Sequence, residues 1–527
     1  MSTPPPGARP AVPVNVVAGP DPAGPNPAGP AGPDPTAGTD PAHPGRPSRL
    51  DREVDVDDAF LARLAGVCDV VDTGEQARLD AGRDWWPLAL VWAVDGTTPA
   101  RPAAVARPST AAEVAAVLRV CNESAIPVTA AAGRSGVCGA SLPVFGGVSL
   151  DLTGLEGIVE VDDTSLLVDV RAGSFVDTFE ETLRTEHGLT LGHWPQSIVL
   201  ATVGGALACR GAGQYSTRYG KIEDIVIGLE VSLADGRLIR TGRTAPRAAT
   251  GPDLTQLFVG SEGTLGVITE ARLRVHPRPP AERRAAFGFA DFAAGLDACR
   301  RVLRRGATPA VLRLYDEAES GRSFDVDHTA VLITLDEGDA GLIDAVMAVV
   351  ADECRDARPL DEGLVHRWLD HRNVLPPLES LVRGGIVADT IEIAASWAAL
   401  PRIYRDATAA LRAIPGTIAA SAHQSHAYSD GACLYFTFAG RPAEAGWDAA
   451  EAYYRQAWDA AISATTNAGG ALSHHHGIGL NRSRYVRDYL GGGFHVLAAV
   501  KSALDPGGVL NPGKLGLPSP FGDPPWP

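Results

Sequence analysis

The segment TAAAGRSGVCGA (residues 129–140) decides the fold of this chain, together with PQSIVLATVGGALACRGAG (195–213) and GSEGTLGVIT (260–269). All three carry glycines and small polar residues where a core would need large apolar side chains. Such glycine density lets the backbone approach a ligand closely, and exposed N–H groups in turns form concave sites for phosphate groups. One glycine loop is weak evidence, because most are turns, but three in one region predict a nucleotide site.

Two common nucleotide-binding motifs are absent, which limits the type of nucleotide site that the chain can form. No GxGxxG motif opens a helix after a strand, and no GxxxxGK[ST] loop is present. These absences exclude the standard dinucleotide fold and the P-loop. The three segments therefore predict a different type of nucleotide-binding domain.

Short apolar runs alternate with helical stretches around these segments, which is typical of an α+β or α/β domain. The stretch 109–125 predicts a helix capped by Ser109 or Thr110, and the stretch 174–188 predicts one that ends at Gly188. From Ala281 onward the alternation continues with fewer glycines, which predicts a second domain of sheet and helices.

We expect six regions along the chain. The first 47 residues are rich in Pro, Gly and Ala and cannot bury enough apolar area to fold, so we predict a disordered tail there. The other regions are an N-terminal helical region (48–98), a domain that carries the three glycine segments (99–278), a second domain of sheet and helices (279–470), a C-terminal segment (471–517) and a second tail (518–527).

Composition limits the classes of partner. The chain has 527 residues, which predicts two or more domains, and a formal net charge of −17, which excludes a nucleic-acid partner because phosphates need clustered Lys and Arg. Its seven cysteines form no CxxC pair, which argues against a zinc ribbon or a disulfide framework. Neither a signal peptide nor a membrane-spanning run is recognisable. We expect a cytoplasmic homodimer, able to touch a membrane surface, that acts on a small-molecule or lipid-like substrate.

Seven short motifs indicate a family. They are GHWPQS, ATVGG, YGKIEDIV, TGPD, GSEGTLGVITEA, GACLYF and SHHHGIG, and all follow Asp84. With them the chain resembles the vanillyl-alcohol-oxidase-type flavoenzymes, and among these it is most similar to the alkyldihydroxyacetonephosphate synthases. The resemblance implies an α+β protein: a two-subdomain FAD-binding domain, then an α+β substrate domain and a C-terminal helical segment.

The resemblance also implies which residues line FAD. The pyrophosphate would lie on the first segment, where two alanines replace part of the family's triple glycine. Covalent members usually attach the flavin through a histidine in or near this loop, and here Cys138 is the only conceivable anchor, so we expect FAD to be non-covalent. The implied cofactor-binding residues are Thr129, Ala130, Ala131, Ala132, Gly133, Arg134, Ser135, Gln196, Ser197, Ile198, Val199, Leu200, Ala201, Thr202, Cys209, Arg210, Gly211, Ala212, Glu262, Gly263, Thr264, Leu265, Gly266, Val267 and Ile268.

His474, His475 and His476 are adjacent in the stretch GGALSHHHGIGLNR. Three neighbouring histidines can bind a metal, belong to an active site or lie on the surface. Their small neighbours predict a tight segment rather than a solvated face, and the sequence nominates no second cluster of ligands to complete a metal site. We therefore predict no bound metal and, from the resemblance, interpret the triplet as active-site histidines near the flavin.

Further residues match the family's active site by resemblance. Tyr435 in GACLYF would be an acid/base, with Tyr428 as a second candidate, although a strand tyrosine more often packs in a sheet. His193 in GHWPQS would be an active-site histidine, or else a capping or packing one. Arg313 in VLRLYD would lie beside the flavin, or else point to solvent.

One feature of the synthases is missing. Their substrate arginine falls on Leu378 when this chain is counted back without gaps from DTIEIA. A shifted alignment would bring Arg372 or Arg383 into the pocket instead. Loss of a permanently charged fork weakens recognition of phosphate or carboxylate, so the substrate can differ. Asn511 and Lys514 end the helix that returns to the flavin, and Lys514 can equally be a solvated charge.

Three functions remain open. The first is a synthase-like exchange of the acyl chain of acyl-dihydroxyacetone phosphate for a fatty alcohol, as in ether-lipid synthesis, without net redox change. The second is an oxidase or dehydrogenase that takes a hydride from a carbon bearing a hydroxyl group, as in a 2-hydroxy acid. The third, a flavin-binding protein without catalysis, is disfavoured by the intact acid/base candidates.

Overall fold

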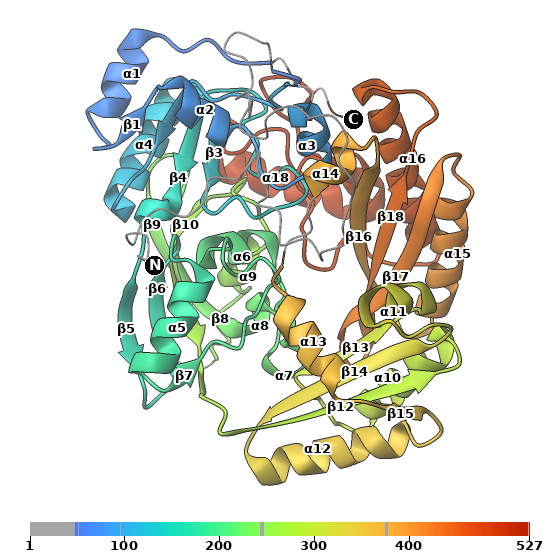
Figure 1. Cartoon of the computed structure of the whole chain (residues 1–527). Helices are drawn as coiled ribbons and strands as arrows, with labels where there is room; N and C mark the ends of the chain where they lie inside the picture. Colours follow the sequence, from blue (N-terminus) through green and yellow to red (C-terminus); the bar gives the residue numbers. More distant parts are fainter. Residues whose placement is uncertain are drawn as a thin grey trace, which may run out of the picture.

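The computed structural model describes residues 48–50, 52–94, 96–242, 247–374, 378–524 and 526. The expected N-terminal tail (1–47) lies outside these described residues. Within them the chain forms three sheets of four or more strands and a two-stranded ribbon, with helices packed on the sheets (Figure 1). This architecture confirms the predicted α+β class.

A four-stranded sheet carries the first glycine segment. Its order is β1-β2-β4-β3, with β2 and β3 parallel to β4. Helix α4 (Ala111–Glu123) shares the core of this sheet, and Thr110 caps α4 by accepting a hydrogen bond from Glu113 N at 3.2 Å. Of the two cap residues that the sequence allowed, the structure selects Thr110. The strands are β1 (Val71–Asp72), β2 (Ala104–Ala106), β3 (Val128–Ala131) and β4 (Val148–Asp151).

A five-stranded antiparallel sheet carries the third glycine segment at the start of β10. Its order is β5-β6-β10-β8-β9, and helices α5 (Val176–Glu186) and α6 (Val203–Cys209) share its core. Gly188 follows α5 with a φ of +65°, the left-handed conformation expected at this helix end. The strands of this sheet are β5 (Ile158–Asp162), β6 (Leu167–Arg171), β8 (Val226–Ser232), β9 (Leu238–Gly242) and β10 (Val267–Arg274). The separate two-stranded ribbon consists of β7 (Leu189–Thr190) and β11 (His276–Pro277).

A seven-stranded antiparallel sheet is the largest layer and lies on the right of Figure 1, beside the two smaller sheets. Its order is β15-β12-β14-β13-β17-β18-β16. The strands are β12 (Ala281–Phe289), β13 (Val311–Tyr315), β14 (Ala330–Gly338), β15 (Arg358–Leu360), β16 (Val387–Ser396), β17 (Thr417–Ala427) and β18 (Gly431–Gly440).

The two faces of this large sheet differ. Leu434, Phe436 and Phe438 of β18 are buried under the helices of one face, which share their core. Because side chains alternate along a strand, Cys433 and Tyr435 point to the opposite face. The helices of the apolar face are α10 (Phe292–Arg304), α12 (Ala340–Glu353), α15 (Leu400–Arg412) and α16 (Trp447–Thr466).

The C-terminal segment returns to the first sheet. After α17 (Ser483–Leu490) and α18 (Gly493–Leu504), Val128 N donates to Val509 O at 2.9 Å and Asn511 N donates to Val128 O at 2.8 Å. Within the expected C-terminal tail, Trp526 is buried against Trp86 and Trp92, with ring centroids 5.3 and 6.0 Å away. At least this side chain is therefore part of a core.

None of the helices in the described part of the chain is both long and apolar enough to cross a bilayer. The remaining helices are α1 (Asp58–Ala65), α2 (Glu75–Ala81), α3 (Pro87–Val94), the 3-10 helix η1 (Leu152–Gly154), α7 (Ser216–Tyr219), α8 (Ile222–Ile225), α9 (Leu254–Phe258), α11 (Glu317–Phe324), α13 (Gly363–His371) and α14 (Leu378–Arg383).

Candidate active site

The first glycine segment leaves β3 as an irregular loop. The backbone amides of residues 133–138 donate no hydrogen bond to any other described residue, so they are free to bind a ligand. A Cβ atom on Gly133 would lie 1.7 Å from Leu200 O, so only glycine lets the first and second glycine segments meet. Free amides in a turn favour an anion.

Glu262 joins the third glycine segment to the histidine loop, residues 473–479. Its buried carboxylate accepts hydrogen bonds from the backbone N of Ile478 at 2.6 Å and of Gly479 at 2.8 Å. Burial raises the pKa of Glu262 to about 6, against the opposing effect of these two donors. A Cβ atom on Gly477 would lie 2.5 Å from Glu262 Oε1, so the loop needs glycine there.

Lys514 is buried beneath the third segment, so the alternative of a solvated charge is wrong. Its Nζ donates to Leu142 O at 2.7 Å, and burial lowers its pKa to about 7, opposed by Glu262 and Asp84. Asn511 Nδ2 donates to Glu262 O at 2.6 Å. Both C-terminal residues therefore brace the glycine segments.

Glu392 on β16 holds the other side of the histidine loop. Its fully buried carboxylate accepts hydrogen bonds from His474 N, from His476 N at 2.8 Å and from Ser473 Oγ at 2.8 Å. Arg482, also fully buried, pairs with it at 2.9 Å. Burial alone would raise the pKa of Glu392, but Arg482 and the hydrogen-bond donors hold it well below its ordinary value. The loop is therefore clamped by an ionised carboxylate.

Cross-strand pairing lines up polar side chains on the open face of the large sheet. Tyr315 on β13, His423 on β17, Tyr435 on β18 and Glu392 on β16 occupy successive paired positions. Directly paired residues point to the same face, so these four form one row. The row meets the histidine loop, because the Tyr435 and His476 ring centroids are 5.4 Å apart.

Tyr435 lies at the centre of this row. Its ring stacks on His423 at 4.8 Å and lies 6.1 Å from His475, and its OH accepts a hydrogen bond from Thr390 Oγ1 at 3.0 Å. Burial raises the pKa of Tyr435 above its ordinary value, so the phenol keeps its proton at neutral pH. Tyr428 also reaches the loop, because its OH lies 3.0 Å from His474 Nε2.

Arg313 faces the site and not the solvent. Its Nε donates to Tyr315 OH at 2.7 Å, and its Nη2 donates to His423 Nε2 at 2.6 Å. The other ring nitrogen, His423 Nδ1, donates to Glu319 on α11 at 2.6 Å. Burial, and then Arg313, lower the pKa of His423, which is therefore neutral at pH 7. This chain of contacts orients Arg313 beside Tyr435.

The three adjacent histidines are neutral as well. Burial lowers their pKa values to about 3 for His474, about 3 for His475 and about 4 for His476, although Glu392 opposes the shift. At neutral pH each ring therefore has one nitrogen that can accept a proton or bind a cation.

Several charged or polar members of the site were not predicted. Their signal was weak: His423, His426 and Glu392 are isolated polar residues on strands, and Glu319 and Arg482 lie outside the strands, so no local pattern groups the five residues. The unpredicted residues are Glu319, Glu392, His423, His426 and Arg482.

Comparison with known proteins identifies the family. Residues 102–242 match the FAD binding domain, and residues 278–515 match the C-terminal domain of FAD linked oxidases. An uncharacterised FAD-linked oxidoreductase of Escherichia coli O157:H7 is 30% identical over 438 residues, which cover 79% of this chain and 89% of that protein. This chain belongs to the FAD-linked oxidoreductases.

Synthases are also among the relatives. The alkyldihydroxyacetonephosphate synthase of Dictyostelium discoideum is 28% identical over 455 residues, 79% of this chain and 73% of the synthase. A solved alkyldihydroxyacetonephosphate synthase structure superposes with a TM-score of 0.72 at 24% identity, covering 89% of this chain and 88% of the other, which shows a shared fold. The resemblance seen in the sequence is confirmed, and FAD is the cofactor of this oxidoreductase.

Two sets of the residues predicted to line FAD have different surroundings in this oxidoreductase. Those of the first segment lie around the free amides of residues 133–138, which fit a pyrophosphate. By contrast, the side chains of Leu265, Val267 and Ile268 lead into β10 and are buried in the cores of the two smaller sheets. Only the backbone of these three residues can face a cofactor, so their role in binding remains a prediction.

His193 does not join the histidine loop. Its ring is buried, and neither ring nitrogen has a hydrogen-bond partner within the described part of the chain. Burial lowers its pKa to about 4. The described residues show no ring contact between His193 and the three adjacent histidines, so the structure supplies no direct support for an active-site role.

The three positions considered for a substrate arginine lie in different surroundings. Leu378 begins α14, which contacts α3 and the edge strand β16. Arg383 is exposed and pairs with Glu379 at 2.7 Å. Arg372 instead lies over the rings of Tyr215 at 5.0 Å and Trp194 at 5.2 Å, next to the second glycine segment.

Proposed function

We propose that this FAD-linked oxidoreductase takes a hydride from a carbon that bears a hydroxyl group, in a substrate that also carries an anionic group. The observation that supports this most is the surroundings of Tyr435, whose ring is enclosed by those of His423, His475 and His476 on the same sheet face as Arg313. Oxidation of such a substrate needs a proton carrier and a cation close together.

His476 is the candidate base. Its Nδ1 lies 3.6 Å from Glu392 Oε1, which leaves Nε2 to accept the hydroxyl proton and lets the carboxylate stabilise the imidazolium that results. Tyr435 keeps its own proton and donates a hydrogen bond to the substrate oxygen. Bound FAD supplies the acceptor for the hydride. The proton thus stays with His476 while the electron pair leaves with the carbon-bound hydrogen.

Two arginines can hold the anionic group. Arg313 is oriented by its contacts with the sheet face and lies beside Tyr435. Arg372 lies over the ring of Tyr215, and the next residue, Ser216, has its Oγ 3.0 Å from Tyr428 OH, which in turn contacts His474. Arg372 Nη1 is buried and has no partner among the described residues, so it is free to bind an anion.

Synthase-type exchange is the second candidate. The triple histidine and Tyr435 match the synthase motifs, and this observation favours replacement of the acyl chain of an acylated dihydroxyacetone phosphate by a fatty alcohol. Leu378 stands against it, because leucine cannot bind the phosphate of that substrate. The exchange needs no electron acceptor, which separates the two candidates.

The deciding experiment uses the FAD-loaded protein without oxygen. We expect at least one 2-hydroxy acid to bleach the flavin absorbance, and we expect no ether product from an acylated dihydroxyacetone phosphate with a fatty alcohol. Ether product without an electron acceptor, together with no bleaching by any hydroxy acid, would reject the oxidation proposal. In that case Leu378→Arg should raise the exchange rate.

We further propose that FAD is bound non-covalently. The first glycine loop contains no histidine, and the Cys138 side chain is buried, with burial raising the pKa of its thiol well above the ordinary value. A protonated, buried thiol is a poor nucleophile for flavin attachment. Acid precipitation should release all flavin into the supernatant, whereas a yellow pellet would contradict the proposal.

A further inference from the structure

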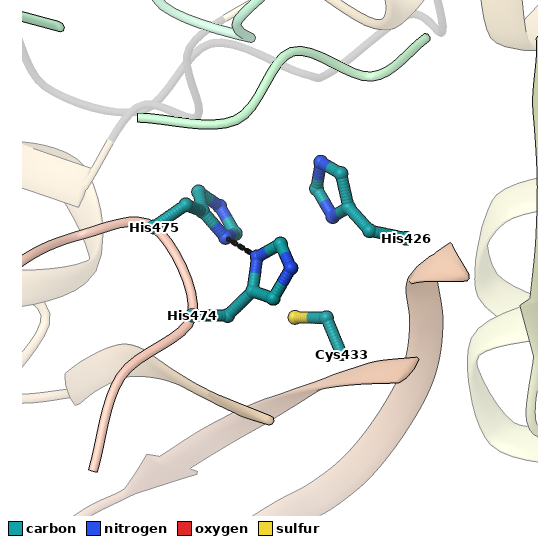
Figure 2. Close-up of side chains that lie close together, drawn as sticks. All are labelled: His426, Cys433, His474 and His475. Atoms are coloured by element: carbon teal, nitrogen blue, oxygen red, sulfur yellow. Dashed lines mark hydrogen bonds between the residues drawn. The ribbon is translucent and has the colours of Figure 1, made fainter. Parts of the chain in front are cut away.

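We propose that His426, Cys433, His474 and His475 bind a zinc ion. One donor atom from each of these four residues lies within 4.8 Å of the others, and Figure 2 shows the four side chains around one space. The proposal replaces our expectation of no metal, which rested on the lack of a second ligand cluster in the sequence. It does not depend on the proposed reaction, because metal content is measured without turnover.

Two features of the fold bring these ligands together. A β-bulge lies between Gln424 and His426 on β17, and it places His426 directly opposite Cys433 on β18. An extra residue in a bulge re-aims the side chain that follows it. The histidine loop then reaches this pair, because Glu392 holds the backbone N of His474. The His426 ring centroid lies 4.8 Å from those of both His474 and His475.

The ring nitrogens are arranged as metal ligands usually are. His426 Nδ1 lies 2.8 Å from Ser425 Oγ, to which it can donate, while Nε2 is buried and has no partner among the described residues. His474 Nε2 similarly lies 3.0 Å from Tyr428 OH, which leaves Nδ1 for the cluster. Ligating histidines typically donate their other ring N–H to an oxygen, which fixes the tautomer and the ring orientation.

The distances suit a small tetrahedral ion. His474 Nδ1 and His475 Nδ1 are 3.0 Å apart, as the dashed line in Figure 2 marks, and two nitrogens on a tetrahedral zinc are roughly 3.3 Å apart. Because all four donor atoms lie within 4.8 Å of one another, no pair must close by more than roughly 1.5 Å, a shift within the reach of side-chain rotation. Three imidazoles and one thiolate are ligands that zinc prefers over magnesium or calcium.

Cys433 would bind zinc as a thiolate, and its proton would leave to water as the Zn–S bond forms. Four protein ligands close the coordination shell, as in structural zinc sites. The ion would therefore fasten the histidine loop to the β17–β18 hairpin and leave His476 and Tyr435 for chemistry.

The first test measures metal in the purified full-length holoenzyme by mass spectrometry. We expect about one zinc per chain, lost in His426→Gln and in Cys433→Ser but kept in the controls His187→Gln and Cys354→Ser, which change a histidine and a cysteine outside the cluster. Ser425→Ala keeps all four ligands but removes a hydroxyl that contacts both His426 and Cys433, and it should weaken zinc affinity roughly 10- to 100-fold. Wild-type protein that takes up no zinc when Zn²⁺ is added would overturn the proposal.

A second measurement uses only wild-type protein, so it still tests the proposal if the variants fail to fold. Wild-type protein loaded with Co²⁺ in place of zinc should show the intense tetrahedral ligand-field bands of cobalt together with a sulfur-to-cobalt charge-transfer band. Bands of octahedral cobalt, or no charge-transfer band, would show that Cys433 is not a ligand and would reject the four-residue site. Equal zinc content in wild type and His426→Gln would reject it as well.

Discussion

The two halves of the site are built from different parts of the chain. The glycine cradle, formed by segments 129–140, 195–213 and 260–269, presents backbone amides, and Gly133 is needed because another backbone lies 1.7 Å from where its Cβ would be. The polar sheet face, formed by Arg313, Tyr315, Glu392, His423 and Tyr435, presents side chains on a regular strand backbone. Substitutions in the cradle should therefore act through chain conformation, and those on the face through single atoms.

The histidine loop connects these two halves, and each half holds it with a carboxylate. Glu262 from the cradle binds the amides of Ile478 and Gly479, and Glu392 from the face binds those of His474 and His476. The two carboxylates differ in charge balance. Glu392 has a buried arginine beside it and a lowered pKa, whereas burial raises the pKa of Glu262. They should respond differently to substitution and to pH.

The largest effect is expected at the sheet face. Tyr435→Phe should lower turnover roughly 100- to 10,000-fold, because a positioned proton carrier is lost while the ring still packs. FAD content should not change, since the cradle is untouched. Tyr453→Phe is the control, because Tyr453 OH bonds to Thr417 outside the site. Loss of FAD in Tyr435→Phe would break the distinction between cradle and face.

The next largest effect is expected at Glu392, the carboxylate of the polar sheet face that binds the histidine loop. Glu392→Gln leaves the Arg482 charge buried without its partner and should cost about 3–5 kcal/mol of stability in urea unfolding. The double variant Glu392→Gln with Arg482→Met removes both charges and should recover part of that loss. Exposed Glu444→Gln is the control and should change stability by less than about 0.5 kcal/mol. A single variant as stable as the wild type would contradict the role of this clamp.

Substitution of Arg372 tests whether the anionic group of the substrate binds outside the polar sheet face. Arg372→Ala should weaken substrate binding about 10- to 100-fold, the loss expected for a charged hydrogen bond, and should leave the rate at saturating substrate nearly unchanged. Arg383→Ala is the matched control, because its guanidinium pairs with Glu379. If only Arg383→Ala raised KM, the anion would be bound at α14 instead.

The smallest effect is the change of stability with pH that Glu262, the carboxylate of the glycine cradle, should cause. The folded-state pKa of Glu262, about 6, lies above its ordinary value of 4.5, so the folded protein binds this proton more tightly. The resulting stabilisation is fully present below pH 4.5 and is lost as the pH rises through about 6; it amounts to about 2 kcal/mol.

Urea unfolding of wild type and Glu262→Gln between pH 4.5 and pH 7 measures this term. Wild type should gain stability relative to the variant as the pH falls. Exposed Glu156→Gln should show the pH profile of the wild type. Parallel profiles for wild type and Glu262→Gln would mean that Glu262 does not titrate in this range.

Local patterns in the sequence predicted local structure well. Thr110 caps α4, and Gly188 ends α5 as expected, because a cap depends on residues only a few positions apart. Tyr435 and Arg313 were found through motifs, and the structure brings both into contact with His423. His423 itself was missed, because its partners Glu319 and Arg313 are 104 and 110 positions away in the chain.

The sequence by itself determined the α+β class, the family and FAD, because contiguous glycine segments and short motifs carry that information in neighbouring residues. Only the tertiary structure decided what surrounds the three adjacent histidines. Glu262 and Glu392 lie 216 and 82 positions away from the loop residues Ile478 and His474 that they bind. His426 and Cys433 come from the β17–β18 hairpin, where sheet register and a bulge place them opposite each other. Side-chain chemistry of this kind depends on distances in space, which residue order alone does not contain.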